Sequence, residues 1–118
     1  MFLELAHTKL PIFQLSQKLA MESYAITKYF PSEERYAMTQ QIRRAALSTH
    51  LNIAEGCSRK SLVERRRYFE IARGSVIEID TAIGTAHKLA YSTQEQLQSL
   101  GEKIIITFKI LSGMIGKL

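Results

Sequence analysis

The residues best suited to chemistry lie close together between positions 59 and 73, where six side chains are basic. A guanidinium presents a planar fork of N–H donors that fits a phosphate group with two parallel hydrogen bonds. Glu64 and Glu70 offset two of these charges, so the segment keeps a net charge of +4. Tyr68 could stack on a base. With Arg43 added, the predicted nucleic-acid-binding residues are Arg43, Arg59, Lys60, Arg65, Arg66, Arg67, Tyr68 and Arg73.

The distribution of charge along the chain supports this prediction. All eight arginines lie between Arg35 and Arg73, and this segment also holds Lys60 and three glutamates. Its net charge is therefore +6, whereas the rest of the chain carries −1 of the total of +5. A basic face suits an anionic partner. The alternative is a solvated charged face that binds nothing.

A second group of polar residues shares one face of an expected helix, because its members follow at steps of three or four. One interpretation is a solvated face. The other is a partly buried hydrogen-bond network in which Arg44 pairs with a carboxylate such as Glu55 or Glu78. A network of that kind sets helix register or mediates subunit contacts rather than catalysing a reaction. The residues of this stripe are Gln41, Arg44, Ser48, Asn52 and Glu55.

Enzyme chemistry finds no support in the sequence. His7, His50 and His87 lie on separate segments, and none stands in an H-x-x-x-H or E-x-x-H spacing. Gly56 lacks the companions of a phosphate-binding loop, G-x-x-x-x-G-K. A lone cysteine, Cys57, excludes an intrachain disulfide and a multi-cysteine zinc site. We therefore predict a protein that is not an enzyme and has no metal or cofactor.

Helices are needed to position these side chains, and the first two are predicted from capping and breaking residues. The first covers residues 10–29, with Thr8 as N-cap and Pro11 in the first turn. The second begins after Ser32 as N-cap, because two glutamates follow in the first turn. Gly56 is predicted as the C′ residue that ends it.

The third and fourth helices have clearer starts. The third covers 62–90 and opens with an S-x-x-E capping box at Ser61. Its apolar residues alternate at steps of three and four from Phe69 to Ala90, the spacing of a left-handed bundle seam. The fourth opens with a capping box at Thr93, and its apolar surface is wide enough to contact another subunit. Its predicted stripe is Leu97, Leu100, Ile104, Phe108, Leu111 and Ile115.

Short connections between long helices predict antiparallel neighbours. We therefore expect an all-α, antiparallel up-and-down four-helix bundle, with residues 1–118 as a single domain. No signal peptide or transmembrane stretch is visible, so a soluble, cytoplasmic protein without membrane contact is expected.

The sequence resembles a family of bacterial four-helix-bundle proteins, the 23S rRNA intervening-sequence proteins. The most specific segments are F-P-S-E-E-R-Y from Phe30 and N-I-A-E-G from Asn52, and the resemblance covers nearly the whole chain. Cys57 stands where the family often has an aromatic residue. The positions that match the family pattern are Gln41, Arg44, Ser48, Asn52, Glu55, Gly56, Gly74, Ser75 and Glu78. Gly74 and Ser75, in mid-helix, are expected to permit close helix approach.

The resemblance implies a homo-oligomer, a pentamer in known relatives. It also implies a relation to the accessory protein of diversity-generating retroelements, a basic pentameric bundle that binds nucleic acid and its reverse transcriptase. We therefore predict a homo-oligomer that binds nucleic acid, with RNA favoured, and a protein partner such as a reverse transcriptase. The alternative function is a protein-interaction scaffold whose basic face docks an acidic partner.

Overall fold

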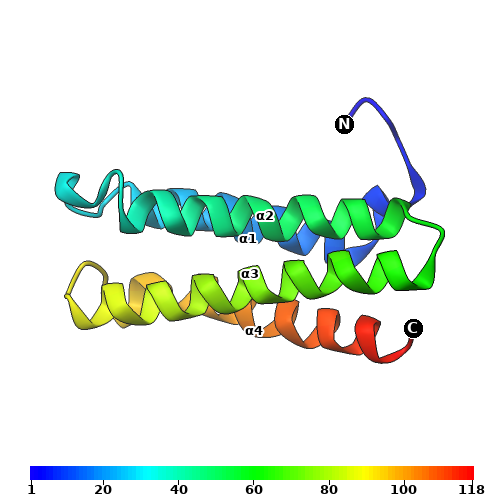
Figure 1. Ribbon diagram of the computed structural model, residues 1–118. Helices are drawn as coiled ribbons and strands as arrows, with labels where there is room; N and C mark the ends of the chain where they lie inside the picture. The colour runs from blue at the N-terminus through cyan, green and yellow to red at the C-terminus, as the bar shows by residue number, and fades with distance from the viewer.

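Four long helices run antiparallel to one another in the computed structural model, which describes residues 1–118 (Figure 1). Neighbouring helices pack in a closed ring: α1 on α2, α2 on α3, α3 on α4 and α4 on α1. The predicted all-α, up-and-down bundle is therefore confirmed. The helices are α1 (Pro11–Thr27), α2 (Met38–Ser58), α3 (Leu62–Lys88) and α4 (Gln94–Gly116), with short 3-10 helices η1 (Ala6–Lys9) and η2 (Ser32–Glu34).

The two ends of the bundle differ in what they contain. The α2–α3 connection and both chain termini lie at one end, and the α1–α2 and α3–α4 connections lie at the other (Figure 1). The long axis of the molecule measures 43 Å. No helix combines the length and the apolar character that crossing a lipid bilayer requires.

The core runs along the bundle axis and is built from the predicted apolar stripes. Leu19, Ile42, Ile53, Ile79 and Leu111 are completely buried. Burying a side chain of this size contributes about 1.5–3 kcal/mol relative to leaving it exposed. The four helices are therefore held together mainly by these central contacts.

Several hydroxyl groups of α1 and α2 are completely buried. Ser23 Oγ donates to the Leu19 carbonyl at 2.8 Å, and Thr49 Oγ1 donates to the Ala45 carbonyl at 2.9 Å. Each hydroxyl thus forms a hydrogen bond within its own helix, which removes the cost of burying an unpaired polar group.

Two predicted helix starts were wrong. Thr8 lies inside η1, and its hydroxyl donates to the Leu5 carbonyl instead of capping α1, which starts at Pro11. Ser32 begins η2, and α2 starts only at Met38. The cause is Glu34, whose carboxylate accepts hydrogen bonds from Met38 N at 3.3 Å and from the Tyr91 hydroxyl at 2.8 Å. This bridge to the α3–α4 connection holds η2 apart from α2.

The predicted end of α2 at Gly56 was also wrong, because α2 continues to Ser58. Gly56 is buried and has a negative φ, so it is not a left-handed cap. A Cβ atom on Gly56 would lie 2.5 Å from Phe69 Cε1. Glycine is therefore required here because the Phe69 ring of α3 occupies the space of a side chain.

The start of α3 follows the prediction, and its end is shorter. Ser61 Oγ accepts from Glu64 N at 3.4 Å. The helix stops at Lys88, and Ala90, predicted as a core position, is exposed with a φ of 61°. Hydrogen bonds from Ala90 N to the His87 carbonyl and from Tyr91 N to the Ala86 carbonyl form a Schellman-type end.

The capping box of α4 at Thr93 is present in full. One stripe residue was assigned to the wrong side: Phe108 is 38% exposed, whereas Thr107 is completely buried in its place. Steps of three and four are both compatible with one helix face, so the sequence pattern alone does not distinguish these two positions.

Candidate nucleic-acid interface

Arg65, at the centre of the predicted basic cluster, forms hydrogen bonds within the chain. Its Nη1 atom donates to the carbonyl of Cys57 at 3.1 Å and to that of Arg59 at 3.2 Å. Its guanidinium also lies 5.5 Å from the centre of the Phe69 ring. A helix leaves its last carbonyls without partners, and a cation there is favourable. Arg65 therefore caps the end of α2.

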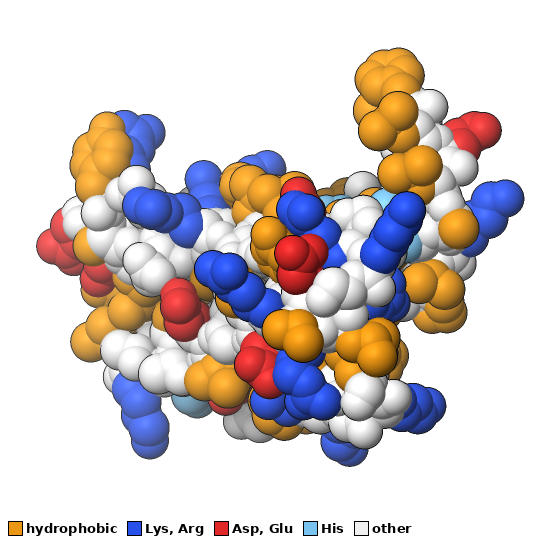
Figure 2. All heavy atoms as spheres, turned by 45° about the vertical axis from the view of Figure 1, so that its right-hand side comes forward, with side chains coloured by type: hydrophobic (Ala, Val, Ile, Leu, Met, Phe, Trp, Pro, Cys, Tyr) orange, Lys and Arg blue, Asp and Glu red, His pale blue; other side chains and the backbone are white.

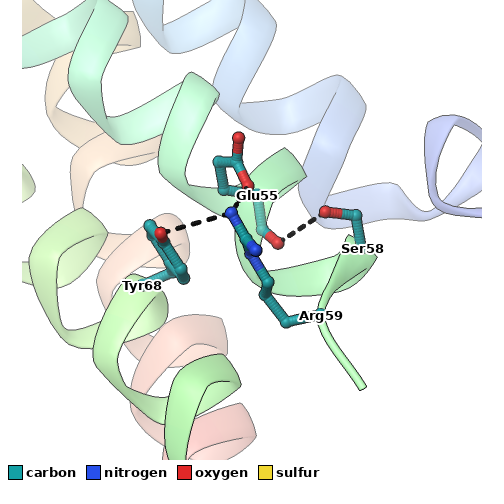
Figure 3. A network of polar contacts seen from close by, with 4 residues as sticks. All are labelled: Glu55, Ser58, Arg59 and Tyr68. Carbon is teal, nitrogen blue, oxygen red and sulfur yellow. Dashed lines mark hydrogen bonds and ion pairs between the residues drawn. The ribbon is translucent and has the colours of Figure 1, made fainter. Parts of the chain in front are cut away.

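Arg59 and Tyr68 are likewise engaged with each other (Figure 3). Arg59 Nη2 lies 2.9 Å from Glu55 Oε2 and donates to the Tyr68 hydroxyl at 3.4 Å. The Arg59 guanidinium stands 5.1 Å from the Tyr68 ring centre. Tyr68 and Glu55 raise the pKa of Arg59. Tyr68 is half-buried and the Arg59 guanidinium lies over its ring, so the ring is not open for stacking with a base.

Arg43 and Arg73 are anchored to neighbouring helices. Arg43 Nε donates to Thr27 Oγ1 at 2.8 Å, and its guanidinium lies 5.0 Å from the Tyr24 ring centre. Arg73 Nη1 donates to Ser112 Oγ at 3.3 Å. Arg43 thereby joins α2 to α1, and Arg73 joins α3 to α4.

The basic residues left open at this end are Lys60, Arg66 and Arg67. Lys60 and Arg67 are exposed and form no hydrogen bond or ion pair within the chain. Arg66 lies 3.9 Å from Glu70, in an exposed pair of the kind that contributes little. Figure 2, which turns this end of the bundle forward, shows basic side chains interspersed with acidic and hydrophobic ones. The open cations therefore form a loose set.

A groove at the opposite end of the bundle contains a second basic set, which the sequence reasoning did not assemble. It has a volume of about 640 Å³ and lies between the end of α1, η2 and the start of α2. Four of its lining residues are basic and none is acidic. Its lining residues are Tyr24, Thr27, Lys28, Phe30, Pro31, Ser32, Arg35, Tyr36, Thr39, Gln40, Arg43, Arg44 and Leu47.

Helical spacing could have indicated part of this groove. Lys28 follows Tyr24 by four residues at the end of α1, and Gln40, Arg44 and Leu47 follow at steps of four and three on α2. Arg35 and Tyr36 lie four residues before Thr39 and Gln40, so the helix predicted after Ser32 would have placed them on the same face. The N-terminus of α2 also lies here, but its Met38 N donates to the Glu34 carboxylate, which offsets the positive end of the helix dipole.

The predicted polar stripe of α2 forms a partial network with α3. Gln41 Nε2 donates to Glu78 Oε2 at 2.8 Å. Ser75 Oγ donates to Ser48 Oγ at 3.0 Å, and Asn52 Nδ2 donates to the Ser48 carbonyl at 2.8 Å. Ser75 is 7% exposed, so the centre of this seam is buried. These contacts set the register of α2 against α3.

Two expectations for this seam were wrong. Arg44 is exposed and pairs with no carboxylate, because Gln41 engages Glu78 and Arg59 engages Glu55. Gly74 does not mediate a close approach within the chain, since no neighbouring atom lies within 4 Å of the position of a Cβ. Gly74 faces outward on α3, one residue before the buried Ser75.

The histidines remain separate from one another. His50 Nδ1 lies 2.7 Å from Ser16 Oγ, and its ring centre is 4.5 Å from that of Phe13. Burial lowers the pKa of His50. Burial also raises the pKa of the Cys57 thiol. No group of three or more His, Cys, Asp or Glu side chains is arranged to hold a metal ion.

The fold and its surfaces define a small helical-bundle protein with basic residues at both ends. The chain belongs to the 23S rRNA-intervening sequence protein family, whose model matches residues 8–113. The resemblance to that family is thereby confirmed. The implied relation to the accessory protein of diversity-generating retroelements stays a prediction.

A solved structure shows the same fold. It is a protein of unknown function from the S23 ribosomal protein family of Bacteroides thetaiotaomicron, which is 23% identical over 88% of this chain and 97% of its own length, with a TM-score of 0.81. At this identity the likeness extends to the fold alone. Among curated proteins, none matches the chain.

Proposed function

We propose that this protein is a homo-oligomeric RNA-binding protein without catalytic chemistry. The observation that carries the proposal is that Lys60 and Arg67 are exposed and unpaired on a chain of net charge +5. Arg66 beside them is only weakly paired. Phosphate contact from such residues is independent of sequence and sensitive to salt. RNA is favoured over DNA by the family resemblance.

Oligomerisation is supported by an apolar face on α3 and α4. Ile77, Ile105 and Ile106 are each about half exposed, at 51%, 55% and 47%. Together with Phe108, two of them border a mainly apolar hollow of about 310 Å³. Contiguous apolar surface of this kind typically marks a protein interface. We propose that a second copy covers it, and the pentamer follows the resemblance.

A ring of subunits would strengthen RNA binding. Each open set of cations is small and loose, so one copy binds weakly. Repetition of the set around a ring makes every further contact intramolecular, and the overall affinity rises without any new contact. A reverse transcriptase or another protein could then share the assembly.

The test is a salt series of RNA and DNA binding on nuclease-treated protein, with light scattering to count subunits. Lys60→Ala/Arg67→Ala is compared with Lys18→Ala/Lys88→Ala, which removes the same charge from other exposed positions. Arg65 is left intact because it caps α2. We expect the first pair to reduce the slope of log affinity against log salt by about 0.7 for each lost single-strand phosphate contact.

The control pair is expected to keep most of the slope. Equal losses in both variants would contradict a site at the α2–α3 end. Absence of binding at low salt by a folded oligomer would reject RNA binding and favour a scaffold that docks an acidic partner. Nuclease-resistant co-purification of a protein would identify such a partner.

A further inference from the structure

The groove between α1, η2 and α2 holds cations that the rest of the chain leaves unpaired. Lys28, Arg35 and Arg44 line it, are exposed, and form no ion pair. Glu33 and Glu34 are neighbours in the sequence but do not line the groove. Glu34 is engaged by Met38 N and the Tyr91 hydroxyl. The positive potential of the groove is therefore uncompensated from within.

The wall of the groove is held in place by internal contacts. Arg43 joins α2 to α1, with Nε donating to Thr27 Oγ1 at 2.8 Å and Nη2 donating to the Tyr24 carbonyl at 3.3 Å. Phe30 is buried, and its ring centre lies 5.5 Å from that of Tyr91. A site whose frame is already ordered loses less freedom when a ligand binds.

An open aromatic ring borders these cations. Tyr36 is 82% exposed, whereas Tyr24 is 38% exposed. The Arg43 guanidinium lies 5.0 Å from the Tyr24 ring centre and the Arg35 guanidinium 5.9 Å from the Tyr36 ring centre, so one face of the exposed Tyr36 ring stays open for a base. An aromatic face beside a basic groove is the usual platform for an unpaired base. Gln40 adds an amide that can both donate and accept at a base edge.

We propose that this groove binds a nucleotide, with the phosphate at Lys28, Arg35 and Arg44 and the base stacked on Tyr36. The volume of about 640 Å³ is in the range of small-ligand sites. The nucleotide is either a free nucleoside phosphate or one residue of a single-stranded RNA. Both present the same chemistry, whereas a base in a duplex is already stacked and unavailable.

The nucleotide site is separate from the α2–α3 end. Arg44 and Arg67 lie in opposite halves of the bundle, so loss of one site leaves the other intact. If the ligand is an RNA strand, the inference rests on the proposed function. If the ligand is a free nucleotide, it does not. Failure of RNA binding at the α2–α3 end is distinguishable from failure of nucleotide binding in the groove, because each end of the bundle is tested with its own substitutions.

The test is calorimetric titration of the intact protein at low salt with four probes: AMP, adenosine, inorganic phosphate and a ten-nucleotide oligoadenylate. We expect saturable binding of AMP, of the oligonucleotide, or of both, and weaker binding of adenosine and phosphate. Tyr36→Ala should weaken binding about tenfold, the usual effect of losing one stacked base. Arg35→Gln/Arg44→Gln should weaken it at least as much.

Two controls separate this site from general effects. Tyr29→Ala removes a ring that is 78% exposed in the same connection but does not line the groove, and it should change affinity less than twofold. Lys60→Ala/Arg67→Ala should leave AMP binding unchanged. Circular dichroism melts should show that the Tyr36 and Arg35/Arg44 variants remain folded, as their exposure predicts.

Binding of AMP supports a free nucleotide as ligand, and binding of the oligonucleotide alone supports an RNA strand. Absence of binding by both probes overturns the proposal. Wild-type affinity in the Tyr36 and Arg35/Arg44 variants overturns it too, even if the protein binds RNA at the α2–α3 end. Phosphate binding as tight as AMP binding overturns the role of Tyr36.

Discussion

The two basic regions of this bundle differ in what their arginines contact. At the α2–α3 end, Arg59 and Arg65 are drawn into contacts with Glu55, Tyr68 and the last carbonyls of α2. In the groove at the other end, Arg35 and Arg44 make no ion pair or hydrogen bond. The cluster with more arginines in the sequence therefore has more of them engaged in contacts within the chain.

The difference shows that arginine density in a sequence does not measure available charge. A connection between two long helices brings helix-end carbonyls, aromatic rings and carboxylates close together. Guanidinium groups with several donors satisfy these groups before any ligand arrives. A groove between helix faces offers fewer internal partners, so three of its four cations, all except Arg43, stay open.

The strongest test of this contrast compares Arg65→Ala with Arg44→Ala. Arg65→Ala removes two charge-assisted hydrogen bonds to carbonyls at the end of α2 and should lower the free energy of unfolding by about 2 kcal/mol. Arg44→Ala removes an exposed, unpaired side chain and should change it by less than about 0.5 kcal/mol. Urea denaturation monitored by circular dichroism measures both. Equal effects would break the contrast.

A second test compares two glycines near these regions. Gly56→Ala forces a Cβ against Phe69, and the overpacking should exceed the gain in helix propensity, for a net loss of about 1–2 kcal/mol. Gly74→Ala meets open space and should raise stability by up to about 1 kcal/mol. Thermal melts measure whether each variant is more or less stable than the wild type.

The Gly74 result also reports on assembly. A loss of stability in Gly74→Ala, together with fewer subunits by light scattering, would place another subunit against this face of α3. Under that outcome the outward-facing glycine permits close approach between copies rather than within one.

The smallest expected effect is a pH dependence at the α1–α2 interface, which joins the two regions. Burial lowers the pKa of His50, so folding favours the neutral ring. This contribution is fully present above the unfolded pKa near 6.5 and is lost as pH falls through the lower folded value. We expect a slight loss of stability as the pH falls below about 6.5. His50→Gln should flatten it, and an unchanged slope would refute the assignment.

Much of the fold follows from residue patterns. The stripe of α3 was correctly placed from Phe69 to Ala86, because burial along a helix repeats every three or four residues. The caps at Ser61 and Thr93 were correctly placed because they need only local hydrogen bonds. Errors concentrate where a distant residue intervenes: Tyr91 at Glu34, and Phe69 with Arg65 at the end of α2.

The candidate sites divide in the same way. The open set of Lys60, Arg66 and Arg67 belongs to the predicted cluster, since a basic run at a helix connection stays at the surface. The groove was missed because it combines residues at the start of α2 with Tyr24 and Lys28 from the end of α1, which only the packing of the two helices brings together. The pairing of Arg44, one of two interpretations of the polar stripe, does not form, because Gln41 donates to Glu78 and Glu55 lies about 16 Å farther along the same helix.

By itself the sequence determined the class of fold, the family, the burial stripes and the basic character, since all four depend on local periodicity and composition. Only the tertiary structure decided which cations remain open. That choice depends on which carbonyls, rings and carboxylates lie within reach of each guanidinium. Those distances arise from the packing of four helices and are not encoded in the spacing along any one of them.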